Sequence, residues 1–89
     1  MSNLGTKTFI LNQIKGLITT YIARGNEHVL KTFRGVCRRY LNEGIITLDD
    51  IMQILNEIES KPQIYLLHYP ERKERLQYLK KMLHEMLRN

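Results

Sequence analysis

The chain has 89 residues, of which 43% are hydrophobic and 26% are charged, and its formal net charge at pH 7 is +5. These fractions are close to the average for globular proteins and the length suits one folded domain, so we expect a single domain over residues 1–89 rather than a disordered chain. The one cysteine, Cys37, excludes an intramolecular disulfide, and the sequence has no apolar run of membrane-spanning length and no signal-peptide pattern. We therefore expect an intracellular, cytoplasmic protein that does not bind membranes.

The first half of the sequence predicts two helices. Apolar residues recur at helical spacing over residues 7–23, and Gly25 is placed to end that helix. Asn26 can cap a second helix over residues 27–43, whose apolar stripe includes Cys37 and which Gly44 ends.

The second half predicts two more helices. Thr47 and Asp50 form a capping box at the start of a helix over residues 48–60, which the Ser60-Lys61-Pro62 sequence ends. Pro70 suits the first position of a last helix over residues 70–88. The predicted fold is therefore all-α, a small bundle of about four short helices.

The connector, residues 62–69 with the sequence PQIYLLHY, allows two interpretations. In the first, Ile64, Leu66 and Leu67 plug one end of the bundle, as apolar side chains usually do. In the second, the connector contacts another molecule through Tyr65, Leu67 and Tyr69, since tyrosine suits half-wet interfaces. The sequence leaves both open.

Basic residues gather in the first and last parts of the chain, whereas residues 45–69 carry four acids and only Lys61. A glycine, Gly35, lies in the middle of the basic stretch FRGVCRRY, on the side of its helix away from the apolar stripe, although a glycine there costs about 0.5–1 kcal/mol. It could let an anionic partner approach, or simply be tolerated on a solvated basic face. Some cations have acids at helical spacing, among them Arg75 four residues after Glu71. The candidate anion-contacting residues are Arg34, Gly35, Arg38, Arg39, Lys73, Lys80 and Lys81.

The sequence contains no pattern typical of an active site or a cofactor site. His28, His68 and His84 lie in three segments without metal-ligand spacing, and Cys37 lies on an apolar stripe. The helix over residues 48–60 carries four acids and no base, which excludes it as a DNA-recognition helix. We expect a protein without enzymatic activity, metal or cofactor.

Two functions remain. The favoured one is a protein-interaction or structural module that forms a symmetric homodimer and binds a protein partner. The helices and connector offer more apolar surface than so small a core can cover, and the acidic middle of one copy could meet a basic end of another. The alternative is a regulatory protein that contacts nucleic-acid phosphates through the helices over residues 27–43 and 70–88.

Overall fold

The computed structural model describes residues 3–88, with side chains from residue 5 to residue 86, and this part of the chain contains helices and no strand. The helices in chain order are α1 (Asn3–Arg24), α2 (Glu27–Asn42), α3 (Leu48–Glu59), α4 (Pro62–Tyr65) and α5 (Pro70–Arg88). The all-α prediction is confirmed. The four predicted helices correspond to α1, α2, α3 and α5, and the connector adds a fifth, short helix, α4.

The predicted helix bounds differ from the observed ones by a few residues. Helix α1 begins at Asn3 rather than at residue 7, since no proline among the first six residues stops the helix from extending. Helices α2 and α3 end one residue earlier than predicted, because Glu43 and Ser60 are cap residues. Both caps keep φ and ψ angles close to helical values, which is why the sequence pattern runs through them.

Local hydrogen bonds set the helix ends as the sequence predicts. The side-chain oxygen of Asn26 accepts from the backbone N–H of His28 at 2.8 Å at the start of α2. At the start of α3, the backbone N–H of Thr47 donates to Asp50 at 2.9 Å, and the backbone N–H of Asp50 donates to the Thr47 hydroxyl at 3.1 Å. Gly25 follows α1 with φ of +67°, a conformation that favours glycine.

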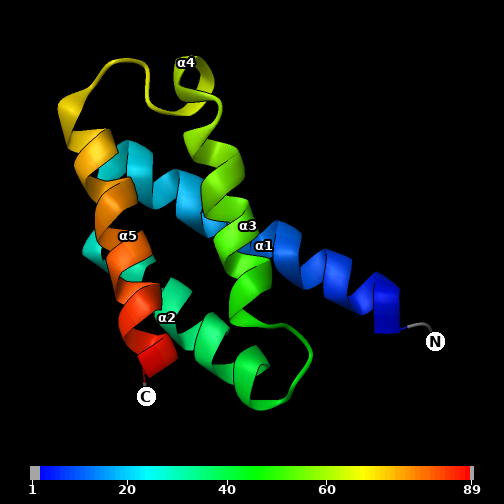
Figure 1. Cartoon of the computed structure of the whole chain (residues 1–89). Helices are drawn as coiled ribbons and strands as arrows, with labels where there is room; N and C mark the ends of the chain where they lie inside the picture. The colour runs from blue at the N-terminus through cyan, green and yellow to red at the C-terminus, as the bar shows by residue number, and fades with distance from the viewer. Residues whose placement is uncertain (1–2, 89) are drawn as a thin grey trace.

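The helices pack around one core. Helices α1 and α2 form a helical hairpin, and α3 and α5 both pack on α1 and on each other (Figure 1). The N-terminal end of α1 extends past the other helices (Figure 1), and Phe9 there is 71% exposed. All the long helices contribute fully buried side chains, among them Ile14, Ile18, Phe33, Leu55, Leu76 and Leu79.

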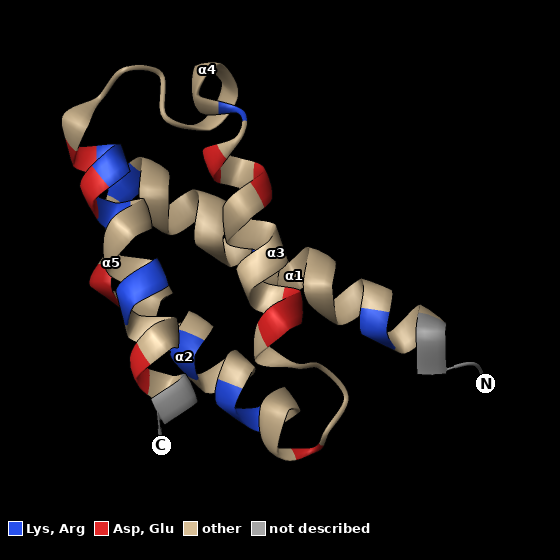
Figure 2. Ribbon diagram, viewed as in Figure 1, with Lys and Arg blue, Asp and Glu red and all other residues tan. Residues whose placement is uncertain are grey.

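Helix α3 carries four acids and no basic residue (Figure 2), and three of these acids pair with lysines of other helices. Lys7 and Lys15 of α1 lie 3.0 Å from Asp50 and 3.2 Å from Glu57, and Lys80 of α5 lies 2.9 Å from Glu59. These acids hold α3 against its own neighbours. They are not left free for a second copy, as the sequence had suggested.

Candidate functional site

The connector buries one of its leucines and exposes the other. Leu66 is only 8% exposed and joins the core, whereas Leu67 is 45% and Ile64 is 58% exposed. The core-plug interpretation is therefore correct for Leu66 and wrong for Leu67 and Ile64.

The backbone explains why these neighbours face opposite ways. After α4, the N–H groups of Leu66 and Leu67 both donate to the carbonyl of Pro62, at 2.9 and 2.8 Å. Leu67 and His68 then take positive φ angles of 51° and 64°, which reverse the chain before α5 begins at Pro70. Such angles cost a non-glycine residue roughly 1–2 kcal/mol each, and strain of this kind collects at functional sites.

The two tyrosines of the connector differ in exposure. Tyr69 is 50% exposed, and the Arg72 guanidinium lies 5.1 Å from its ring centre. Tyr65 is half-buried, with the Lys15 ammonium 5.9 Å from its ring centre and its carbonyl accepting from Arg72 at 3.2 Å. Of the predicted interface residues, Leu67 and Tyr69 are thus the accessible pair, while Tyr65 supports the connector.

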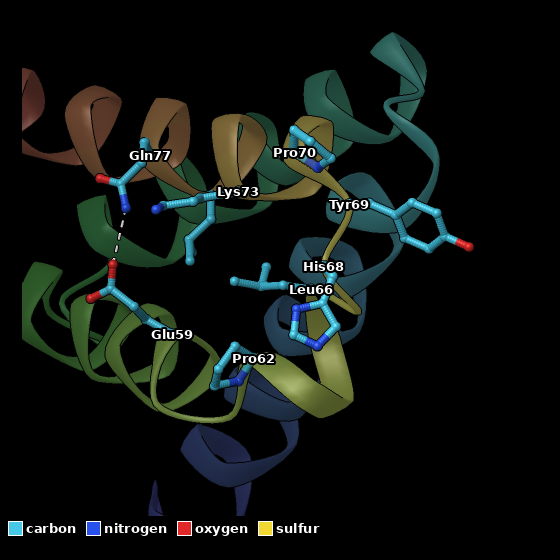
Figure 3. Close-up of a pocket in the computed structure, with 9 residues that line it drawn as sticks. Glu59, Pro62, Leu66, His68, Tyr69, Pro70, Lys73 and Gln77 are labelled. Atoms are coloured by element: carbon cyan, nitrogen blue, oxygen red, sulfur yellow. Dashed lines mark hydrogen bonds between the residues drawn. The ribbon is translucent and has the colours of Figure 1, made fainter.

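A hollow of about 580 Å³ lies between the end of α3, α4 and the start of α5 (Figure 3). Leu66 projects toward it, whereas the Tyr69 ring points away (Figure 3). The sequence does not reveal this hollow because its walls come from three separate segments. It is lined by Glu59, Pro62, Leu66, His68, Tyr69, Pro70, Lys73, Leu76 and Gln77.

The rim of the hollow carries one acidic and one basic side chain, Glu59 and Lys73. Glu59 accepts hydrogen bonds from Lys80 at 2.9 Å and from Gln77 at 3.0 Å, which lower the pKa of its carboxyl below the usual value. Glu59 is therefore a carboxylate at neutral pH, and the Lys73 ammonium lies on the same rim. The hollow thus combines an apolar interior with a mixed-charge edge.

Two of the predicted anion-contacting residues line a second, smaller feature, a groove of about 110 Å³ between α2 and α5. Here Nη2 of Arg34 donates to the Tyr78 hydroxyl at 2.6 Å, and Nε donates to the Met82 sulfur at 3.1 Å. Arg38 is exposed and forms no ion pair with any described residue. We call this feature the α2–α5 groove, lined by Phe33, Arg34, Cys37, Arg38, Met82 and Met86.

The other candidate cations do not join them on one face. Arg39 pairs with Glu43 at 3.5 Å on its own helix, and Lys73 lies at the hollow on the α3 side of α5. Lys80 was expected to be unpaired, but Glu59 of α3 holds it because α3 packs on that flank of α5. Lys81 is exposed on α5.

Gly35 is exposed on α2 but does not line the α2–α5 groove. A Cβ at this position would have no described atom within 4 Å. The space beside this glycine is therefore open, and nothing within the described part of the chain requires a glycine there.

Residues typical of catalysis or metal binding are not assembled in the described part of the chain. Burial raises the pKa of the Cys37 thiol to about 12, so it is protonated at neutral pH. No three His, Cys, Asp or Glu side chains among the described residues are placed to hold a metal ion. Within residues 3–88, none of the helices has both the length and the apolar character needed to cross a bilayer.

Comparison of the sequence with protein-family models and with curated proteins, and of the fold with solved structures, finds no match. The geometry of the connector, the hollow and the α2–α5 groove is therefore the basis for a functional proposal.

Proposed function

We propose that this protein is a non-enzymatic interaction module that self-associates as a symmetric homodimer through its connector end. The observation that carries the proposal is that the connector exposes Leu67 while the residues before and after it, Leu66 and His68, line a hollow of about 580 Å³. In the proposed dimer, Leu67 of each copy enters the hollow of the other.

A second copy of the chain suits this surface because a two-fold interface must be complementary to itself. The connector supplies both an exposed apolar side chain, Leu67, and part of the wall of a hollow, so each copy can supply both halves of the contact. The rim also carries Glu59 and Lys73, so a two-fold arrangement can bring opposite charges together without facing like charges.

The backbone at Leu67 supports the same role. The chain reversal at Leu67 and His68, with its positive φ angles, leaves the leucine side chain outside the core. Because Leu67 is 45% exposed, its complete burial in a partner is worth about half of the usual value, roughly 0.7–1.4 kcal/mol.

Sedimentation velocity of three proteins tests the dimer. The parent protein should shift from monomer to dimer as its concentration rises through tens of micromolar. Leu67→Asp should stay monomeric with its helical circular dichroism unchanged, because Leu67 is not one of the buried core residues. The matched control is Phe9→Asp, the same kind of change at an exposed apolar residue on α1, which should still dimerise.

Only monomer at every concentration would overturn self-association. If Leu67→Asp dimerises like the parent, the dimer interface does not include Leu67 and the proposed interface is wrong. Loss of helical signal in Leu67→Asp would show that the leucine belongs to the core and would equally overturn the proposed interface.

Nucleic-acid binding, the other function considered, has less support from the geometry. Phosphate contacts along a duplex require several cations on one continuous face. Lys80 and Arg39 are instead paired with acids, and Lys73 lies on the α3 side of α5, away from Arg34.

A further inference from the structure

The α2–α5 groove combines an apolar floor with an arginine rim. Phe33 and Cys37 at its base are 1% exposed each, and Met82 and Met86 of α5 form the opposite wall. Methionine walls adapt to differently shaped apolar side chains, a property found at helix-binding surfaces. The groove thus suits an apolar side chain presented by a partner.

The arginines on the rim of the groove have N–H donors available for an anion. Arg34 uses Nε and Nη2 to contact Met82 and Tyr78, which orients the guanidinium and leaves Nη1 for another acceptor. Arg38 is one turn further along α2, and Lys31 is one turn before Arg34. These three cations have no acidic partner among the described residues, whereas Lys7, Lys15, Lys61 and Lys80 all do.

We infer that this groove binds an acidic amphipathic helix of another protein. An apolar side chain of that helix enters the methionine-walled groove, and carboxylates of the helix, spaced three or four residues apart, meet Arg34 and Arg38 one turn apart on α2. A phosphate backbone satisfies the arginines but leaves the apolar groove empty.

The acidic helix is not α3 of a second copy. Asp50, Glu57 and Glu59 already bind lysines of their own chain, and releasing them would undo the contacts that hold α3 in place. The binding helix therefore belongs to a different protein. This inference does not depend on the dimer, because the groove and the connector are separate surfaces.

The probe is a synthetic helical peptide of about five turns, with leucines at helical spacing flanked by glutamates, and with a fluorescent label. Its affinity is measured by fluorescence anisotropy, and its site by amide chemical shifts of the ¹⁵N-labelled full chain. Shifts should collect on α2 and on the half of α5 that contains Tyr78, Met82 and Met86.

Charge variants test the role of the arginines. Arg34→Glu with Arg38→Glu should weaken binding at least about tenfold, which equals about 1.4 kcal/mol. Arg24→Glu with Lys81→Glu changes the net charge equally at exposed residues that line neither the groove nor the hollow, and should alter affinity by less than about threefold. Arg38→Gln alone should also weaken binding, and because Arg38 is exposed and forms no ion pair with a described residue, the fold should be kept.

Further proteins and probes separate the outcomes. Leu67→Asp, the dimer-deficient variant, should bind the peptide as the parent does, and so should Gly35→Ala on the outer side of α2. A peptide with every glutamate changed to glutamine should bind much more weakly.

Failure of the acidic peptide to bind, shifts confined to the connector, or equal binding by the charge-reversed variant would each overturn the inference. A different result would indicate phosphate recognition instead of helix binding. In that case a short DNA duplex would bind with a steep salt dependence, Arg34→Glu with Arg38→Glu would abolish this binding, and the peptide would not bind.

Discussion

At the scale of single residues, two glycines show how the same residue type can serve different purposes. Gly25 ends α1 with φ of +67°, and a Cβ there would lie 2.7 Å from the Arg75 guanidinium. Gly35 lies inside α2 with open space around it. The first is required by the fold, and the second is not.

We predict that Gly35→Ala raises the free energy of unfolding by about 0.5–1 kcal/mol, because alanine loses less backbone entropy in a helix than glycine does. Gly25→Ala should instead lower it by roughly 1–2 kcal/mol, since it forces alanine into the left-handed region and against Arg75. Urea unfolding of both variants at one protein concentration measures the two changes. A loss of stability in Gly35→Ala would mean that this glycine has a structural role that its open surroundings do not reveal.

At the scale of elements, α3 depends on ionised acids. Burial would raise the pKa of Asp50, but hydrogen bonds from the Thr47 backbone and from Lys7 outweigh it and lower that pKa. The pKa of Glu57 is lowered by its hydrogen bond with Lys15, and that of Glu59 by its hydrogen bonds with Lys80 and Gln77. A lowered pKa in the folded state means that the contribution to stability is present above the unfolded pKa and is lost as pH falls through the folded one.

We therefore predict that the free energy of unfolding falls as pH drops below about 4.5, where the unfolded acids begin to bind protons. Urea unfolding between neutral pH and about pH 3 measures the decline. The control is Asp50→Asn with Glu59→Gln, which removes two of the three titrating partners. This double variant should be less stable than the parent at neutral pH and should approach it at acidic pH. A constant difference across the whole range would contradict the prediction.

At the scale of the whole molecule, Arg75 joins parts of the chain that are far apart in sequence. Its Nη1 donates to the carbonyl of Ile22 at 2.8 Å, and its guanidinium lies close to Gly25, so this side chain links α5 to the end of α1 and to the turn that follows it. The sequence suggests a different partner, Glu71, four residues earlier on the same helix. No ion pair joins these two described residues.

We predict that Arg75→Leu lowers the free energy of unfolding by about 1.5–3 kcal/mol, the usual contribution of a hydrogen bond to a charged donor. Glu71→Gln should change it by less than about 0.5 kcal/mol, as expected at an exposed position without a partner. Thermal and urea unfolding of both variants compare the two. Equal losses would indicate that the Glu71–Arg75 pair, and not the bond to Ile22, stabilises the molecule in solution.

The sequence by itself determined the four long helices and the approximate position of most of their ends. Asn26, the Thr47–Asp50 capping box, Gly25 and Pro70 act through hydrogen bonds and backbone angles within a few residues of themselves, so the local pattern is sufficient to place them. The buried position of Cys37 follows in the same way, from its place on the apolar stripe of α2.

The tertiary structure alone decided which side chains are available to a partner. Whether Leu66 or Leu67 is buried depends on a chain reversal at two non-glycine residues, for which the sequence PQIYLLHY carries no turn signal. In the sequence, Lys80 and Arg34 are both candidate anion-contacting residues. In the fold, Lys80 pairs with Glu59 of α3, whereas Arg34 contacts Tyr78 at an open groove. The hollow and the groove are formed by helices that are distant along the chain, and contacts over such separations leave no periodic pattern in the sequence.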